Sequence, residues 1–201
     1  MSEYTEAPFY DIAMVEEGAP AMVPWERSGW KPLYEEIASW IDPFHDVVDL
    51  GCGTGRFAAC LAANGHMGGY VGIDFSDATL TEASRYMASR SEAMTVEWRQ
   101  EDLREWQPSR TRGNCTYVCT ETLEHLADDQ DLVRRIPPGH RMVLSVPSYD
   151  DVAHIRAFRH AGEVWGRYEH LLAFRRWHLI DVGGERWKIH LCDTMRRSDT
   201  W

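Results

Sequence analysis

The stretch Val47-Val48-Asp49-Leu50-Gly51-Cys52-Gly53-Thr54-Gly55-Arg56-Phe57 decides the fold of this chain. Its first four residues are a short apolar run typical of a buried strand, and its last residues begin an apolar helical pattern. Between them, glycines at alternate positions permit a tight turn and let a ligand approach the backbone closely. The first N–H groups of the helix point toward such a ligand. The stretch therefore predicts a strand–loop–helix unit that binds a small molecule.

The spacing of these glycines excludes two common nucleotide sites. A dinucleotide-binding G-x-G-x-x-G fingerprint places its third glycine one residue later. A P-loop needs a Gly-Lys-Ser/Thr sequence, which is absent here. No Lys or Arg occurs in the loop before Arg56, which disfavours a polyphosphate ligand.

Two carboxylates downstream of the loop complete the predicted pocket. Asp74 lies in a second strand-like run, Tyr70–Phe75, where it can accept hydrogen bonds from two ribose hydroxyls. Asp102 follows a third strand that starts at Thr95, and it can accept a hydrogen bond from the exocyclic amine of adenine. Together with the glycine loop, these acids predict a site for an adenosine that carries no phosphate.

Strand-like and helix-like runs alternate along the rest of the chain. This alternation predicts a parallel sheet with helices on both faces. Near the end, two alternating runs flank Gly183-Gly184, which predicts an antiparallel hairpin. Helices are expected over 32–41, 56–63, 77–90 and 122–136, and strands over 47–50, 70–75, 95–98, 116–119, 141–146, 176–181 and 186–191.

These motifs resemble those of the class I S-adenosylmethionine-dependent methyltransferases. The resemblance covers about residues 44–150 and rests on DLGCGTG at 49–55, YVGIDFS at 70–76, EDL at 101–103 and CTETLEHL at 119–126. It implies an α/β fold, a Rossmann-like seven-stranded sheet that is mostly parallel, with an antiparallel terminal hairpin and helices on both faces. The expected organisation is a single domain over 1–201, with an N-terminal arm or lid and helix at 1–40, a donor-binding core at 44–150, an acceptor-side insert at 147–178 and a terminal hairpin at 176–192.

The resemblance also implies the cofactor, S-adenosylmethionine, and its contacts. The glycine loop would hold the methionine part, Asp74 the ribose and Asp102 the adenine. Thr120, after the fourth strand, would line the cleft of the methyl donor. The expected cofactor-binding residues are Asp49, Gly51, Cys52, Gly53, Gly55, Asp74, Phe75, Asp102, Leu103 and Thr120.

Glu121, Glu124 and His125 follow the fourth strand at i, i+3 and i+4, a spacing that would place them on one helix face. Three hypotheses fit this pattern. Glu124 and His125 orient the helix while Glu121 lines the pocket; or His125 or Glu121 is a general base; or the three residues bind a divalent cation that holds a pair of acceptor hydroxyls.

The metal hypothesis has a family precedent. E-x-x-E-H resembles the metal site of small-RNA 3′-end 2′-O-methyltransferases and a segment of ubiquinone-pathway O-methyltransferases. His154 is the candidate fourth ligand, and a set of two carboxylates and two imidazoles suits Mg²⁺, Mn²⁺ or Zn²⁺. The expected catalytic residues are therefore His125, Glu121 and His154, and the expected metal ligands are Glu121, Glu124, His125 and His154.

Charge limits the acceptor. The formal net charge of −11 argues against duplex DNA and anionic lipid as partners. The charge is uneven, because residues 1–133 carry a net −15 and residues 134–201 a net +4. Arginines and aromatic residues interleave over 154–178, so Arg156, Arg167 and Tyr168 are the expected acceptor contacts. The basic half permits an anionic small molecule or an RNA end.

The resulting expectation is a methyltransferase that transfers a methyl group to a small molecule, with oxygen as the expected acceptor atom. The alternatives are a metal-assisted 2′-O-methyltransferase on RNA or nucleotide ends, and a donor-binding module without catalysis. The chain has no apolar run of about 18 residues, its start is acidic, and its five cysteines form no CxxC pair. A reducing, cytoplasmic setting without a membrane partner is the expectation.

Overall fold

The computed structural model describes residues 23–90, 94–109 and 114–198. Most of the predicted arm at 1–40 lies outside these residues. Within them, a seven-stranded sheet has the order β3-β2-β1-β4-β5-β7-β6. Neighbouring strands from β3 to β5 are parallel, whereas β7 is antiparallel to both β5 and β6. The predicted Rossmann-like sheet with an antiparallel terminal hairpin is confirmed.

The strands are short at the start of the sheet and long at its end. Their bounds are β1 (Asp46–Leu50), β2 (Tyr70–Asp74), β3 (Val96–Gln100), β4 (Cys115–Thr120), β5 (Arg141–Pro147), β6 (Leu172–Val182) and β7 (Trp187–Arg196). The terminal hairpin is therefore longer than predicted. The end of the predicted insert at 147–178 belongs to β6.

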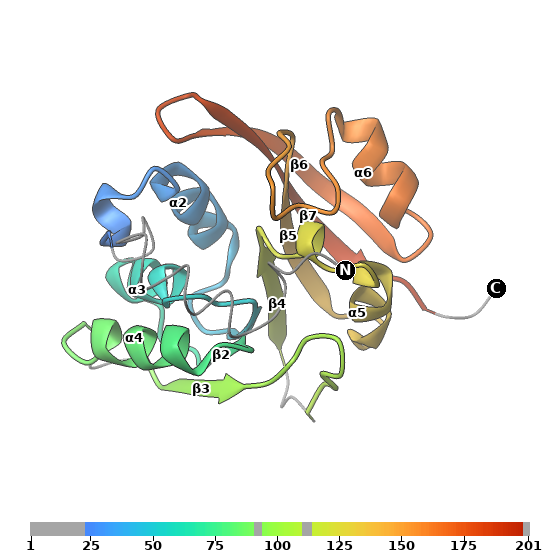
Figure 1. Ribbon diagram of the computed structural model, residues 1–201. Helices are drawn as coiled ribbons and strands as arrows, with labels where there is room; N and C mark the ends of the chain where they lie inside the picture. The colour runs from blue at the N-terminus through green and yellow to red at the C-terminus, as the bar shows by residue number, and fades with distance from the viewer. Residues whose placement is uncertain (1–22, 91–93, 110–113, 199–201) are drawn as a thin grey trace.

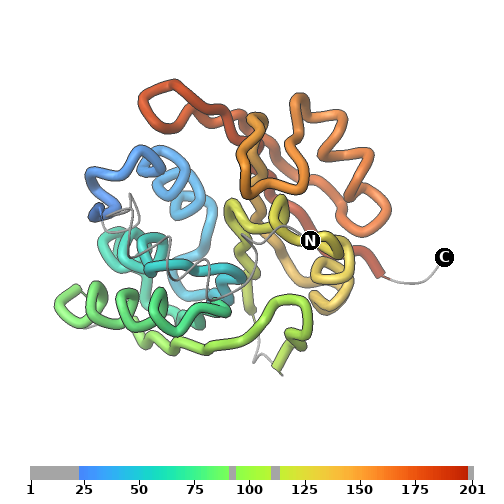
Figure 2. The backbone as a smooth tube through the Cα atoms, viewed as in Figure 1, coloured from blue at the N-terminus to red at the C-terminus, as the bar shows by residue number. Residues whose placement is uncertain are grey.

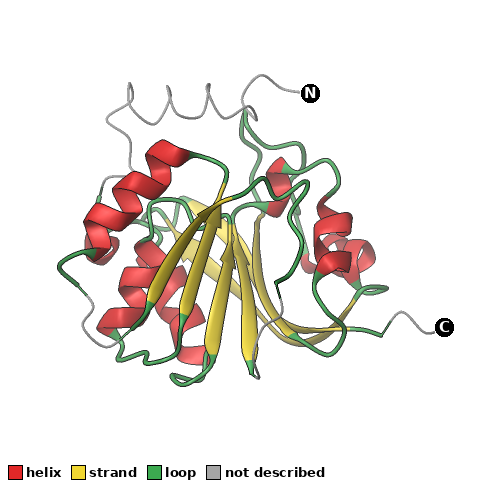
Figure 3. Ribbon diagram, turned by 90° about the horizontal axis from the view of Figure 1, so that it is seen from below, coloured by secondary structure: helices red, strands yellow, loops and turns green. Residues whose placement is uncertain are grey.

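Helices cover both faces of the sheet, as Figures 1 and 3 show. The helices α2 (Lys31–Trp40), α3 (Arg56–Ala63) and α4 (Asp77–Met87) lie on one face. The other face carries α5 (Asp129–Arg135) and α6 (Ala161–Tyr168). Two 3₁₀ turns, η3 (Trp25–Arg27) and η4 (Leu123–His125), complete the set among the described residues.

Alternation along the strands divides the core into two clusters. Successive side chains of a strand point to opposite faces of a sheet. Val47 of β1 and Val118 of β4 accordingly pack with Leu33 and Ile37 of α2. Their neighbours Val48 and Cys119 belong to the second cluster, under α5 and α6. Both faces of the central strands are buried, which explains their uninterrupted apolar runs.

The single helix predicted over 122–136 is wrong. The chain forms the turn η4 over Leu123–His125 and then the separate helix α5 over Asp129–Arg135. The carbonyls of Leu123 and Leu126 accept hydrogen bonds from the side chain of Arg156, at 2.7 and 2.6 Å. Arg156 thus satisfies backbone carbonyls that would otherwise need the N–H groups of a continuing helix. The chain can therefore leave helical geometry between η4 and α5.

The N-terminal segment and the terminal hairpin meet above the sheet (Figure 2). The amide of Gly183 donates to the carbonyl of Gly29 at 3.0 Å. The rings of Trp30 and Trp187 lie 5.7 Å apart. We call residues 23–30 the roof segment, because they line one side of the cavity described below. Among the described residues, no helix is long and apolar enough to cross a membrane.

Candidate functional site

The loop after β1 needs its glycines. Gly51, Gly53 and Gly55 have φ of +83°, +53° and +73°, a region that side chains disfavour. A Cβ atom on Gly51 would lie 2.3 Å from Oγ1 of Thr122, just after β4. The loop can therefore approach the end of β4 only with glycine at position 51.

Asp49 is buried at the base of this loop, with 1% of its surface exposed. Its Oδ2 accepts a 2.5 Å hydrogen bond from the phenol of Tyr70 on β2. Within the described part of the chain, its Oδ1 has no hydrogen-bond partner. Burial raises the pKa of Asp49 to about 7, although the hydrogen bond from Tyr70 lowers it. Oδ1 is therefore a buried acceptor at the base of the loop with which a cationic group could pair.

Asp74, the predicted ribose residue, ties the loop to the end of β2. Its Oδ2 accepts from the amide of Gly53 at 3.0 Å, and its Oδ1 accepts from the amide of Ser76 at 3.0 Å. Ser76 in turn begins α4, because its Oγ accepts from the amide of Thr79 at 3.0 Å. Ser76 is thereby the N-cap of α4.

Asp102, the predicted adenine residue, is engaged by a neighbour. Its Oδ1 and Oδ2 accept from Nε of Arg104, at 3.0 and 2.9 Å. Hydrogen bonds from the Arg104 guanidinium lower the pKa of Asp102. A ligand at this point would share the carboxylate with Arg104.

A cavity of about 340 Å³ lies between the loop, α2 and the roof segment. Six residues that the sequence had selected line it: Asp49, Gly51, Cys52, Gly53, Thr120 and Glu121. Gly55, Asp74, Phe75, Asp102 and Leu103, also predicted for the cofactor, are not among its lining residues. They lie in or after the loop and at the ends of β2 and β3.

The sequence interpretation missed several residues that line the cavity. Arg27, Trp30 and Tyr34 reach it from the roof segment and α2, and Arg56 and Phe57 reach it from α3. The sequence predicts an arm or lid and a helix within residues 1–40, but it does not show that this segment packs over the glycine loop.

Glu121 lies where the cavity meets the end of β4. Its φ of +49° is unusual for a residue with a side chain. Its amide donates to Oγ of Ser145 at 3.1 Å, and that hydroxyl donates to Oε1 of Glu121 at 2.8 Å. Burial raises the pKa of Glu121 to about 7, against the lowering effect of hydrogen bonds from Ser145 and Tyr149. A carboxyl with this pKa suits proton transfer near neutral pH.

Glu124, His125 and His154 come together beside Glu121. Each offers a ligand atom, and these atoms lie within 4.8 Å of one another. Nδ1 of His125 lies 2.9 Å from the carbonyl oxygen of Ala153, so it carries the proton and leaves Nε2 free to act as a ligand. Nε2 lies 3.8 Å from Oε1 of Glu124. We call these three residues the Glu-His-His cluster.

Glu124 is the most unusual member of this cluster. It is 0% exposed, and within the described residues neither carboxylate oxygen has a hydrogen-bond partner. Burial and the neighbouring Glu121 raise its pKa well above the usual range. Nδ1 of His154 likewise lacks a partner in the described chain. Buried polar atoms normally have partners, so these atoms fit a site that binds a further group.

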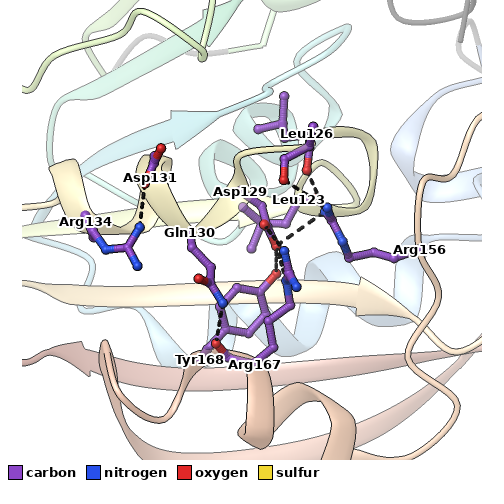
Figure 4. A network of polar contacts seen from close by, with 10 residues as sticks. Leu123, Leu126, Asp129, Gln130, Asp131, Arg134, Arg156, Arg167 and Tyr168 are labelled. Carbon is purple, nitrogen blue, oxygen red and sulfur yellow. Dashed lines mark hydrogen bonds and ion pairs between the residues drawn. The ribbon is translucent and has the colours of Figure 1, made fainter. Parts of the chain in front are cut away.

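The structure assigns a different role to the predicted acceptor contacts Arg156, Arg167 and Tyr168. All three surround the fully buried carboxylate of Asp129 on α5 (Figure 4). Arg167 donates to both of its oxygens, at 2.7 and 2.5 Å, and the phenol of Tyr168 donates to Oδ2 at 2.5 Å. Tyr168 is itself 0% exposed. None of the three lines the described cavity, and a buried carboxylate needs these partners.

Comparisons with known proteins agree with this geometry. The family profile described as "Methyltransferase domain" matches residues 47–137, from β1 into the turn after α5. A trans-aconitate 2-methyltransferase from Azoarcus sp. strain BH72 is 31% identical over 130 residues, which are 62% of this chain and 48% of that protein. Residues 47–137 thus form a methyltransferase domain, and the chain is similar to S-adenosylmethionine-dependent methyltransferases. The glycine loop lies within this matched region.

Two further methyltransferases extend the comparison. A ubiquinone biosynthesis O-methyltransferase from Pseudomonas savastanoi pv. phaseolicola is 29% identical over 149 residues, covering 66% of this chain and 61% of that protein. Among solved structures, magnesium protoporphyrin IX methyltransferase from Synechocystis, with bound SAH, has a TM-score of 0.68 at 14% identity and covers 94% of this chain and 97% of its own. This methyltransferase chain therefore spans about half to three fifths of its curated relatives' length.

Proposed function

We propose that this methyltransferase transfers the methyl group of S-adenosylmethionine to an oxygen atom of a small acceptor. The observation that carries the proposal is the position of Glu121, which lines the cavity of the glycine loop and has a pKa of about 7. One relative is named as an O-methyltransferase, and the name of another gives trans-aconitate, a carboxylic acid. Both names favour an oxygen acceptor.

The cavity offers a contact for each charged part of the donor. The donor's ammonium group would donate to Oδ1 of Asp49, which has no hydrogen-bond partner among the described residues, and the donor's carboxylate would lie near Arg27 or Arg56. Asp74 would bind the ribose and Asp102, shared with Arg104, the adenine. With its two arginines, the same cavity favours an acceptor that is itself anionic.

Methyl transfer here would be an in-line displacement at carbon. A lone pair of the acceptor oxygen forms the new C–O bond while the C–S bond breaks, and the sulfonium becomes a neutral thioether. A hydroxyl acceptor would lose its proton to the carboxylate of Glu121, whereas a carboxylate acceptor is already ionised and needs no base. The protein otherwise contributes by alignment, because holding two reactants in line removes most of the entropic barrier. The roof segment would exclude water during this step.

The test measures transfer of a labelled methyl group to a panel of hydroxyl and carboxylic acids, with donor affinity from calorimetry. We expect label on oxygen, and a Glu121→Gln variant that binds S-adenosylhomocysteine normally but turns over at least 100-fold more slowly. Donor binding without transfer to any acceptor would favour the non-catalytic module. Label on nitrogen or carbon would overturn the oxygen assignment.

We further propose that the Glu-His-His cluster binds a divalent cation. The buried carboxylate of Glu124 supports this proposal, because neither of its oxygens has a hydrogen-bond partner in the described chain. A bound cation would give these oxygens a positively charged partner. Mixed carboxylate and imidazole ligands suit Mn²⁺ or Zn²⁺, with Mg²⁺ as a further candidate. A cation held there would act as a Lewis acid toward an acceptor oxygen.

The cation proposal has its own test. Metal analysis of purified protein and Mn²⁺ titration by calorimetry should give a single site that Glu124→Gln removes. Chelator should abolish turnover and leave donor affinity unchanged. A short RNA with a free 3′ end belongs in the same acceptor panel, because an adjacent hydroxyl pair suits such a site. Turnover that survives excess chelator would exclude the catalytic cation.

A further inference from the structure

The loop that carries His154 is joined to the turn that carries Glu124 and His125. The amide of Ile155 donates to the carbonyl of Glu124 at 2.9 Å. The carbonyl of Ala153 accepts from Nδ1 of His125 at 2.9 Å. These contacts lie on either side of His154 in the sequence. They bring the three side chains of the Glu-His-His cluster together from two distant segments.

Arg156 forms the charged part of this junction (Figure 4). Its Nη1 donates to the carbonyls of Leu123 and Leu126, at 2.7 and 2.6 Å. Its Nη2 donates to the carbonyl of Ala127 at 3.1 Å. These carbonyls belong to η4 and the residues after it, on both sides of Glu124 and His125. A guanidinium presents several donors in a fixed plane, so one side chain can hold the whole turn.

Asp129 supplies the counter-charge. Its Oδ2 lies 3.4 Å from Nη1 of Arg156. The same buried carboxylate also accepts hydrogen bonds from Arg167 and Tyr168. Loss of Arg156 therefore leaves Asp129 with two partners, and it avoids the large cost of an isolated buried charge. The effect of losing the contacts of Arg156 with the turn can therefore be measured apart from the effect of losing its ion pair with Asp129.

We propose that Arg156 is a positioning residue that fixes His154 in reach of Glu124 and His125. The inference rests on the proposed cation site, because the spacing of these side chains matters only if they act together. Residues that orient metal ligands typically contribute about 10–100-fold in metal affinity. Among the described residues, the hydrogen bonds of Arg156 go to the backbone on both sides of the ligand side chains, and its charge also lowers the pKa of Glu124.

Arg167 offers a matched control. It pairs with the same carboxylate of Asp129, at 2.5 Å, but in the described residues it contacts no carbonyl of the turn. Arg156→Ala and Arg167→Ala thus each remove one arginine from Asp129, and only the first frees the turn. Arg156→Lys keeps the charge near Asp129 and loses the planar set of donors.

The experiment measures Mn²⁺ affinity and S-adenosylhomocysteine affinity by calorimetry, together with the thermal midpoint, for the full chain and each variant. We expect Arg156→Ala to weaken Mn²⁺ binding about 10–100-fold, with Arg156→Lys intermediate and Arg167→Ala within about twofold of the parent protein. Donor affinity should stay unchanged in all three. If Arg156→Ala does not fold, Arg156→Lys carries the comparison. Equal losses in the Arg156 and Arg167 variants, or no loss in either, would overturn the positioning role.

Failure of the cation site itself has a different signature. If the parent protein binds no Mn²⁺ or Zn²⁺, the cation proposal is wrong. The position of Arg156 is then tested by NMR of the His125 and His154 rings. Shifted imidazole signals in Arg156→Ala, and unshifted signals in Arg167→Ala, would still support the positioning role. Unshifted signals in both variants would overturn it.

Discussion

The phenol of Tyr70 on β2 donates a 2.5 Å hydrogen bond to Oδ2 of Asp49 on β1, a residue that lines the cavity, while Oδ1 has no hydrogen-bond partner among the described residues. In the β1–β2 register Tyr70 pairs with Val47 and Asp49 pairs with Gly72, so the phenol reaches two residues along the sheet to the carboxylate. Burial raises the pKa of Asp49 to about 7, so this carboxylate titrates near neutral pH.

Donor affinity should therefore depend on pH. The ionised form of Asp49 attracts the donor's ammonium group, and this form is lost as the pH falls through about 7. We expect the affinity for S-adenosylhomocysteine to rise about tenfold between pH 6 and pH 8, by calorimetry, as one ionisation accounts for. Asp49→Asn should bind weakly with a flat profile. If the affinity of Asp49→Asn still rose with pH as steeply as that of the parent protein, another titrating group would be responsible.

Asp49 should also limit the stability of the fold. Its pKa of about 7 lies above the usual 3.8 of an aspartate, so the folded state retains a proton that the unfolded state releases. The free energy of unfolding should then fall as the pH rises from about 4 to 7. Thermal denaturation of Asp49→Asn should show a midpoint above that of the parent protein at pH 8 and near it at pH 4.5. A gain of equal size at both values would contradict the titration of Asp49.

Gly51→Ala should destabilise the protein more than a matched glycine substitution. Gly51 and Gly139 have similar φ, +83° and +80°, but a Cβ on Gly51 meets Thr122 at 2.3 Å whereas one on Gly139 meets nothing within 4 Å. We expect Gly139→Ala to cost about 1–2 kcal/mol from backbone strain alone, and Gly51→Ala to cost more in urea denaturation. Adding Thr122→Ala should recover part of the difference. Equal losses in the two single variants would show that Thr122 moves aside.

Asp74→Ala should weaken donor binding by about 1–3 kcal/mol, the usual cost of removing a hydrogen-bond acceptor. Adenosine contains the ribose but no methionine part, whereas S-adenosylhomocysteine contains both. Comparing the two affinities therefore shows which part of the donor Asp74 contacts. Equal losses for adenosine and S-adenosylhomocysteine are expected by calorimetry. A loss confined to S-adenosylhomocysteine would mean that Asp74 acts through the amide of Gly53. Asp77→Ala, an exposed carboxylate in the next turn, is the control.

The glycine loop and strand alternation predicted the fold well, because these signals are local. Apolar runs and positive-φ positions depend on neighbours in the sequence, and the helix over Arg56–Ala63 was found with its correct ends. The segment after β4 was misjudged for the opposite reason. Its helical spacing is broken by Arg156, more than twenty residues downstream, which holds its carbonyls.

The site was predicted in part. Residues next to the glycine loop were found, because chain connectivity places them in the cavity. Arg27 and Tyr34 were missed, because they reach the same cavity only through the packing of the roof segment and α2. Arg167 and Tyr168 were predicted as acceptor contacts because an arginine and a tyrosine have the same sequence signature in a binding site and in a buried polar network. Their hydrogen bonds to the buried Asp129 place them in the network.

The strand order has a consequence for biogenesis. In the described sheet, β6 pairs only with β7, and β7 pairs with β5. During synthesis β6 emerges first but has no place in the sheet until β7 follows it. The two strands must therefore close as a hairpin, a step that takes about 1–10 μs, and add to the sheet together. Because the amide of Gly183 in this hairpin donates to the carbonyl of Gly29, the ribosome must release the residues of β7 before this contact beside the cavity can form.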